Sequence, residues 1–235
     1  DFTDVKSPYT IGHSRGVADL AGEAARALGL GDQAATTVRR AGLVHDLGRL
    51  GVPNAVWDKP GPLGHAETER VRLHPYLTER MLACSPALAP LAAVAVQHHE
   101  RLDGSGYPRG LSGGALSLEG RVLAAADFYR SRTEPRPHRP ARSAAEAAAQ
   151  LRAEARAGRM DSGAAEAVLS AAGHPATRRP ARPADLTGAY QFLVSDASAF
   201  VTGTVLSVDG GNCRYDAGAP GRRHHGSRRR ARRRG

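Results

Sequence analysis

Residues 98–110 read HHERLDGSGYPRG and follow an apolar run at residues 91–96. Two adjacent histidines, His98 and His99, stand where this run ends. Neighbouring side chains in a helix interior diverge by about 100° and cannot easily share a target. At a helix end they can converge, and the Gly and Pro residues that follow allow the chain to turn tightly. A histidine pair that opens into such a loop is suited to metal binding.

Further candidate ligands stand on other apolar segments. His45 and Asp46 are adjacent at the end of an earlier apolar run, and His74 and Asp127 lie on two later ones. A lone histidine on an apolar helix face is usually a hydrogen-bonded core residue, and a carboxylate there is costly to bury unless it is paired or metal-bound. Taken together, these groups offer the nitrogen and oxygen ligands of first-row divalent metals.

The order and spacing of four motifs resemble the HD-GYP branch of the HD phosphohydrolases. These motifs are HDLGRLGVP at residues 45–53, His74-Pro75, the segment at residues 98–108, and ADFY at residues 126–129. The resemblance covers about residues 1–175 and implies an all-α fold, the HD-domain helical bundle. The high alanine content and the low aromatic content, 5%, also favour closely packed helices.

The resemblance implies a site with two divalent metal ions, iron or manganese being the best candidates. One ion would be held by His45, Asp46 and Asp127, and the other by Asp46, His74, His98 and His99. His13 is a candidate metal or substrate ligand. Several members of the branch carry a Glu four residues before that histidine, which helps to bind a third metal; Tyr9 stands there in this chain, so two ions are expected.

The same resemblance implies hydrolysis of cyclic di-GMP to the linear dinucleotide or to GMP, in bacterial second-messenger signalling. Two alternatives remain open: a degenerate module that senses a nucleotide or docks a protein such as a diguanylate cyclase-type domain, and a phosphohydrolase for another nucleotide. Residues 130–132, which are more apolar in the family, keep the degenerate alternative open. Asp46 and Arg49 are the candidate catalytic residues, and the candidate substrate-binding residues are Arg49, Asp103, Gly104, Gly106, Tyr107, Pro108 and Arg109.

Helical periodicity predicts most of the elements of this domain. Apolar residues recur at helical spacing from Val17 to Leu28, and a second helix starts at Asp32 as its N-cap. The many prolines and glycines of residues 51–64 predict a turn-rich connection. Further helices are expected at residues 71–82, 118–128, 143–157 and 162–173.

The C-terminal part of the chain differs in character from the rest. The net charge is +10, but eight arginines at residues 222–234 account for eight of these charges, which leaves +2 for everything else. We therefore expect a disordered tail at residues 214–235, which would bind nucleic acid only nonspecifically through phosphates, if at all. Residues 188–213, after a linker at residues 176–187, resemble the end of a short-chain dehydrogenase.

No dehydrogenase chemistry is expected from that fragment. The chain has no glycine-rich dinucleotide fingerprint and no Tyr-x-x-x-Lys pair, since no lysine follows Lys59. We interpret the fragment as a gene fusion, a frame change or a gene-model artefact. The chain has only two cysteines, and no apolar run reaches the roughly 20 residues that a membrane span needs, so a cytoplasmic protein without a membrane segment is expected.

Overall fold

The structure is a computed structural model that describes residues 3–175. Every regular element in this range is helical, which confirms the all-α prediction. The expected segments at residues 176–187, 188–213 and 214–235 lie outside the described residues. In order, the elements are η1 (Asp4–Lys6), α1 (His13–Ala27), α2 (Asp32–Val44), η2 (Leu47–Gly51), α3 (Asn54–Trp57), α4 (His65–Arg72), α5 (His74–Ala83), α6 (Ala89–Ala95), η3 (Gly113–Ala115), α7 (Leu118–Thr133), α8 (Ala144–Arg156) and α9 (Ser162–Ala171).

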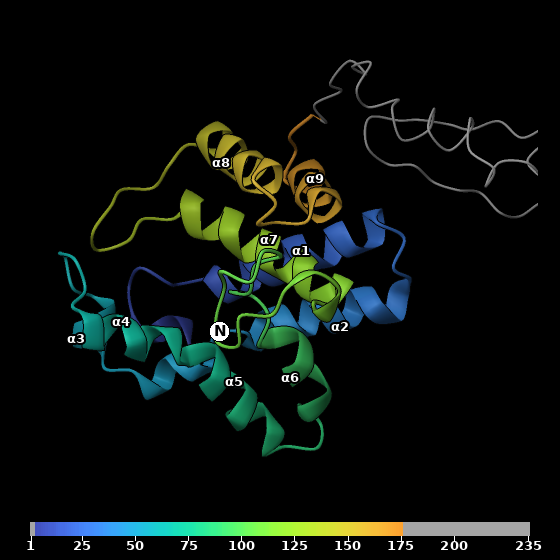
Figure 1. Cartoon of the computed structure of the whole chain (residues 1–235). Coiled ribbons are helices and arrows are strands. Elements are labelled where there is room, and N and C mark those ends of the chain that lie inside the picture. Colours follow the sequence, from blue (N-terminus) through green and yellow to red (C-terminus); the bar gives the residue numbers. More distant parts are fainter. Residues whose placement is uncertain (1–2, 176–235) are drawn as a thin grey trace, which may run out of the picture. The chain divides into compact units, whose positions relative to one another are not determined.

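Helix α7 runs through the centre of the domain (Figure 1). It packs against α1, α2, α6, α8 and α9, and α1 in turn packs against α2 and α9. Small side chains on the facing surfaces allow this close packing: Ala21, Ala25 and Ala41 are fully buried, as are Ala125 and Ala126. The alanine-rich core therefore explains how several helices can approach one central helix.

The elements from η2 to α6 form a second group, and Figure 1 shows its helices α3–α6 on the side of the domain away from α8 and α9. Helix α5 packs against η2 and α6, and α6 packs against α2 and α7. These contacts bring the ends of several short elements toward the middle of α7.

The helix expected at residues 71–82 is divided in two. Helix α4 ends at Arg72, and α5 begins at His74. The cause is Pro75, which lacks a backbone N–H and disfavours the continuation of a helix through the preceding residue, but fits the first turn of a new helix. The break places His74 at a helix start, where its ring can reach the centre of the domain.

Side-chain caps fix the helices that carry other candidate ligands. Asp4 lies before α1, and its carboxylate accepts the backbone N–H of Ser14 at 3.0 Å and the Ser14 hydroxyl at 2.5 Å. An anion at this end of a helix is favoured by the unpaired N–H groups there. Ser117 caps α7 by accepting the N–H of Gly120. Both caps anchor the helices from which His13 and Asp127 project.

Gly48 allows η2 to pack directly on the start of α5. A Cβ atom at residue 48 would overlap with the backbone oxygen of His74 and the backbone nitrogen of Thr78. The Gly48 N–H donates to the Thr78 hydroxyl at 2.8 Å, and that hydroxyl donates to the backbone oxygen of His45 at 2.8 Å. This contact ties the HD motif to the helix that begins with His74.

Gly48→Ala should therefore lower the free energy of unfolding by about 1–3 kcal/mol, because overpacking of a tight contact costs this much. Urea unfolding followed by circular dichroism measures the change. Gly61→Ala is the matched control, since a Cβ at residue 61 has no neighbour within 4 Å. Equal stability of the two variants would show that η2 and α5 are not in close contact.

Among the described residues, no helix has the length and apolar character needed to cross a membrane.

Candidate metal centre

Five histidines and two aspartates from separate elements meet in one buried cluster. His13 begins α1, His45 follows α2, His74 begins α5, and Asp127 lies within α7. His98 and His99 lie in the turn after α6, and Asp46 precedes η2. Three overlapping groups within the cluster place their ligand atoms within 4.8 Å of one another: His74, His98 and His99; His13, His45 and Asp127; and His45, Asp46 and His98.

Local hydrogen bonds orient three of the histidine rings in the same way. The Nδ1 atoms of His45, His74 and His98 lie 2.5–2.6 Å from the backbone oxygen three residues earlier. These oxygens can only accept, so each Nδ1 donates. In the neutral ring the proton is then on Nδ1, and Nε2 presents a lone pair to the centre of the cluster. This is the tautomer that an imidazole needs in order to bind a metal through Nε2.

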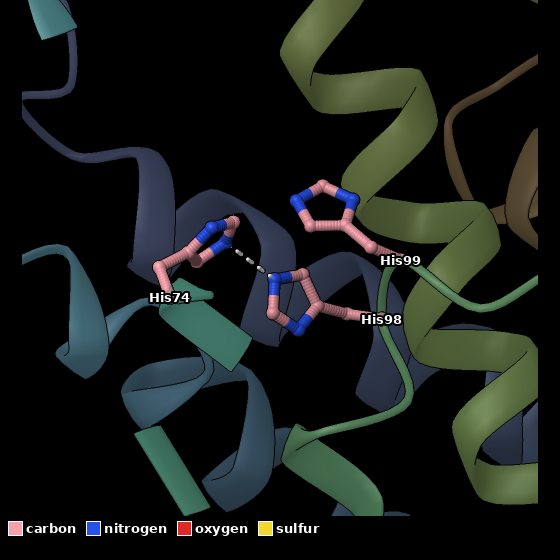
Figure 2. A group of neighbouring side chains, drawn as sticks. All are labelled: His74, His98 and His99. Atoms are coloured by element: carbon pink, nitrogen blue, oxygen red, sulfur yellow. Dashed lines mark hydrogen bonds between the residues drawn. The ribbon is translucent and has the colours of Figure 1, made fainter. Parts of the chain in front are cut away.

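The inward-facing nitrogens lack the donors that they need. Figure 2 shows the rings of His74, His98 and His99 gathered together, with Nε2 of His74 only 3.2 Å from Nε2 of His98. With both Nδ1 atoms protonated, two lone pairs face each other across this gap. Nε2 of His45 is buried and has no hydrogen-bond partner among the described residues. Cations within the cluster would satisfy these nitrogens, so the donor set fits divalent metals.

Asp46 faces two sets of ligands with its two oxygens. Its Oδ1 lies 3.2 Å from Nε2 of His74 and 3.7 Å from Nε2 of His98. Its Oδ2 lies 3.7 Å from Nε2 of His45 and 3.9 Å from Nε2 of His13. A carboxylate in this position can link two neighbouring ions.

Asp127 closes the opposite side of the cluster. Its Oδ1 lies 3.2 Å from Nε2 of His13 and 3.9 Å from Nε2 of His45, and its Oδ2 lies 3.7 Å from Nδ1 of His99. His99 therefore presents Nδ1 to the cluster, unlike the other four histidines.

The electrostatic environment of the cluster favours neutral His98 and His99 and an anionic Asp46. Burial, with neighbouring His45 and His74, lowers the pKa of His98 to about 3, and burial together with His98 holds the pKa of His99 well below its usual value. Burial alone would raise the pKa of Asp46, but His45 and Arg49 outweigh it and hold this pKa well below its usual range. Near neutral pH, Asp46 is therefore anionic while His98 and His99 are neutral.

His13 has a different partner on its outer side. Its Nδ1 lies 2.7 Å from Oε2 of Glu134, just after α7. Burial opposes a charge on His13, but the hydrogen bonds to Asp127 and Glu134 outweigh this effect and raise its pKa to about 9. The ring lies between two carboxylates, with Nε2 toward the cluster and Nδ1 away from it.

A cleft opens over the cluster and is lined by cationic and aromatic side chains. Nη1 of Arg49 lies 3.4 Å from Oδ2 of Asp46, and its guanidinium stacks on the ring of Trp57 at 3.8 Å. Other lining residues come from the segment after Asp127, namely Arg132, Arg136, His138 and Arg139. The sequence reasoning missed Trp57, Glu134 and these arginines, and only the unusual charge of residues 130–132 hinted at them.

The charged residues after Asp127 pack without disturbing α7. Arg130 lies against Gly16 and pairs with Glu134 at 3.2 Å. The Arg132 guanidinium stacks over the ring of Phe128 at 4.3 Å, and its Nε donates to Gln150 at 3.2 Å. Stacked and anchored in this way, Arg132 keeps its charge at the edge of the cleft.

The Gly-Tyr-Pro loop contributes one lining residue to the cleft. Tyr107 is half-buried, with its ring 4.8 Å from that of His99. Buried Glu100 holds the loop by accepting the backbone N–H groups of Arg109 and Leu111 at 2.8 and 2.9 Å. The Arg109 side chain turns toward Glu79 at 2.5 Å. The cleft lining does not include five of the candidate substrate residues, Asp103, Gly104, Gly106, Pro108 and Arg109, whose assignment stays a prediction.

The model of the HD domain family matches residues 2–163. The chain therefore belongs to the HD domain family, and its segment from His98 to Pro108 carries the motif that resembles the HD-GYP branch. A model described as enoyl-(acyl carrier protein) reductase matches residues 144–212. This second match is less than a third of the chain, and its first part falls on α8 and α9, which pack on α7.

Two curated relatives are similar to the described domain. The 3'3'-cGAMP-specific phosphodiesterase 3 of Vibrio cholerae is 45% identical over 140 residues, which are 60% of this chain and 30% of that protein. A cyclic di-GMP phosphodiesterase of Pseudomonas aeruginosa is 41% identical over 140 residues, 59% of this chain and 34% of that protein. The chain thus spans about a third of the length of these relatives.

A solved structure of an HDG"Y"P protein from Bdellovibrio bacteriovorus has the same fold. The superposition has a TM-score of 0.58 at 18% sequence identity. It includes 72% of this chain and 53% of the Bdellovibrio bacteriovorus chain. At this sequence identity the similarity supports only the assignment of the helical fold.

Proposed function

We propose that this domain is a metal-dependent phosphodiesterase that opens a cyclic dinucleotide. The observation that carries the proposal is the convergence of five imidazoles and two carboxylates beneath a cleft lined by arginines. The ligands suit divalent first-row metals, and the arginines suit phosphate.

The proposed centre holds two ions, iron or manganese. The first would be held by His13, His45, Asp127 and Oδ2 of Asp46, and the second by His74, His98, His99 and Oδ1 of Asp46. Such ions supply Lewis-acid polarisation of a phosphodiester and activation of water. This division follows the two faces of Asp46 and agrees with the sequence-based assignment, to which it adds His13 as a ligand of the first ion.

The chain's own cations would bind and orient the substrate. Arg49 is held in place by Asp46 and by the ring of Trp57, so its outer edge is available for a phosphate oxygen. Arg132 and Arg136 line the same cleft. A planar guanidinium binds phosphate by two parallel hydrogen bonds, which fixes the phosphodiester over the ligand cluster. Asp46 and Arg49 are accordingly the residues to which we assign catalytic roles.

Cyclic di-GMP is the substrate that we infer, and 3'3'-cGAMP is the second candidate. The name of the Pseudomonas aeruginosa relative supports cyclic di-GMP, and the name of the Vibrio cholerae relative, which is 45% identical, supports 3'3'-cGAMP. The two differ in one purine base and share both phosphodiesters, so the metal and arginine chemistry applies equally to both.

A substrate panel tests the proposal. Protein purified anaerobically and loaded with Mn²⁺ or Fe²⁺ is incubated with cyclic di-GMP, 3'3'-cGAMP and bis-(p-nitrophenyl) phosphate, and the products are separated by chromatography. We expect a linear dinucleotide from at least one cyclic dinucleotide, and no product after chelation of the metal. Tight binding of a cyclic dinucleotide without turnover would instead favour a sensory module.

A further inference from the structure

Glu134 is the carboxylate on which three side chains of the site region converge. Its Oε2 lies 2.7 Å from Nδ1 of His13 and 3.2 Å from Nη2 of Arg136, and its Oε1 lies 3.2 Å from Nη2 of Arg130. The side chain is only 16% exposed. These contacts join α1 to the segment that follows α7, two parts of the chain more than 100 residues apart.

His13 needs a partner from elsewhere in the chain because its own helix start does not supply one. His45, His74 and His98 each use the backbone oxygen three residues earlier. For His13 that oxygen belongs to Thr10, which accepts the backbone N–H of His13 at 3.0 Å, and Nδ1 of the ring faces Glu134 instead. Glu134 takes over the orienting role, and as an anion it makes the opposite nitrogen a stronger ligand than a carbonyl would.

The position of Glu134 excludes it from direct metal binding in this arrangement. It contacts Nδ1 of His13, whereas the clustered ligands Asp46 and Asp127 face Nε2. Glu134 must therefore act through His13.

The same carboxylate also fixes an arginine of the cleft. Arg136 donates from Nη2 to Glu134 and from Nη1 to the backbone oxygen of Tyr9 at 3.0 Å, and its side chain is only 13% exposed. Removal of the Glu134 charge would weaken the outer partner of the His13 ring and leave the Arg136 guanidinium held mainly by the backbone oxygen of Tyr9.

We propose that Glu134 is a positioning residue that orients His13 for the first metal ion and Arg136 for a substrate phosphate, and so couples the metal centre to the cleft. The inference rests on the metal centre and the phosphate-binding cleft of the proposed function. Its first test uses metal alone, so that it gives a result even if no cyclic dinucleotide is cleaved.

Titration of the metal-free full chain with Mn²⁺ by calorimetry tests whether Glu134 orients His13 for the first metal ion. Glu134→Gln should weaken the binding of one Mn²⁺ by about tenfold, within the range typical for outer partners of metal-binding histidines. The matched control is Glu154→Gln. Glu154 lies on α8, is partly buried and pairs with Arg159 at 2.6 Å, so the variant removes a similar charge away from the cluster. The control should bind Mn²⁺ like the wild type.

A double-mutant cycle separates positioning from general loosening of the fold. In a His13→Ala background, Glu134→Gln should cause no further loss of Mn²⁺ affinity, because the residue through which it acts is gone. If Glu134→Gln lowers the helical circular dichroism, Glu134→Asp replaces it, with a smaller loss expected since the charge is kept. Unchanged Mn²⁺ affinity in folded Glu134 variants, or an equal loss in both backgrounds, would overturn the inference.

The steady-state kinetics of the Mn²⁺-saturated protein test whether Glu134 also orients Arg136. Glu134→Gln should raise KM for the cyclic dinucleotide several-fold even when both metal sites are full, whereas Glu154→Gln should not. A normal KM at saturating Mn²⁺ would remove the coupling to the cleft. A wild-type protein that binds two Mn²⁺ ions but cleaves neither dinucleotide would instead refute the proposed function and leave the metal titration to decide the role at His13.

Discussion

Replacement of Asp46 by alanine should abolish hydrolysis and lower the bound metal at both positions. Asp46 is the one carboxylate of the cluster whose two oxygens face two separate pairs of histidines, at 3.2–3.9 Å. Loss of even an outer partner of a metal ligand typically costs 10–100-fold in affinity or activity. We expect the loss of a shared ligand to cost more than the upper end of this roughly 10–100-fold range, so kcat/KM should fall by at least about a hundredfold.

Metal content by elemental analysis and turnover by chromatography check this expectation. Asp19→Ala is the control, since Asp19 is an exposed aspartate paired with Arg39 on the surface. Near-normal metal content and turnover in Asp46→Ala would remove the model in which this carboxylate bridges two ions.

Replacement of His74 or His98 by alanine should selectively empty the second metal position. Their Nε2 atoms lie 3.2 Å apart and both face Oδ1 of Asp46, so each variant leaves too few ligands there. The first position keeps His13, His45 and Asp127. We expect the metal content to fall from two ions to about one per chain and hydrolysis to fall by at least about a hundredfold, as for other losses of ligation.

His65→Ala is a close control for His74→Ala. Both histidines are the first residue of a helix, α4 and α5 respectively, but His65 is exposed. It should keep full metal content and activity. If His65 and His74 tolerate alanine equally well, the histidine cluster serves packing and not metal binding.

The sequence was informative about the ligands because each lies in a short motif with its own signal. His45-Asp46, His74-Pro75 and His98-His99 all stand at helix ends, where the local pattern changes. The structure brings them together with Asp127 as the motif order implied. The helix expected at residues 71–82 was wrong in one respect, since Pro75 starts a new helix at His74 and so divides the segment.

The residues that the sequence did not reveal act through contacts between distant segments. Glu134 reaches His13 across 121 positions, and no local periodicity encodes such a pair. Arg132 lies in the last turn of α7, and Arg136 lies in the segment after it, which has no helical period or known motif. Their place at the cleft therefore depends on how α7 ends. Arg109 is the opposite case. It stands next to the Gly-Tyr-Pro motif in the sequence, but its side chain pairs with Glu79 and is not part of the cleft lining.

The metal content of the wild-type chain tests the central claim most directly. Protein purified without oxygen, exchanged into chelator-treated buffer and measured by elemental analysis should contain two iron or manganese ions per chain. Tyr9 carries a phenol and offers no carboxylate for a third ion. A count near zero after reconstitution would contradict the metal centre itself, and a count near three would contradict its division into two positions around Asp46.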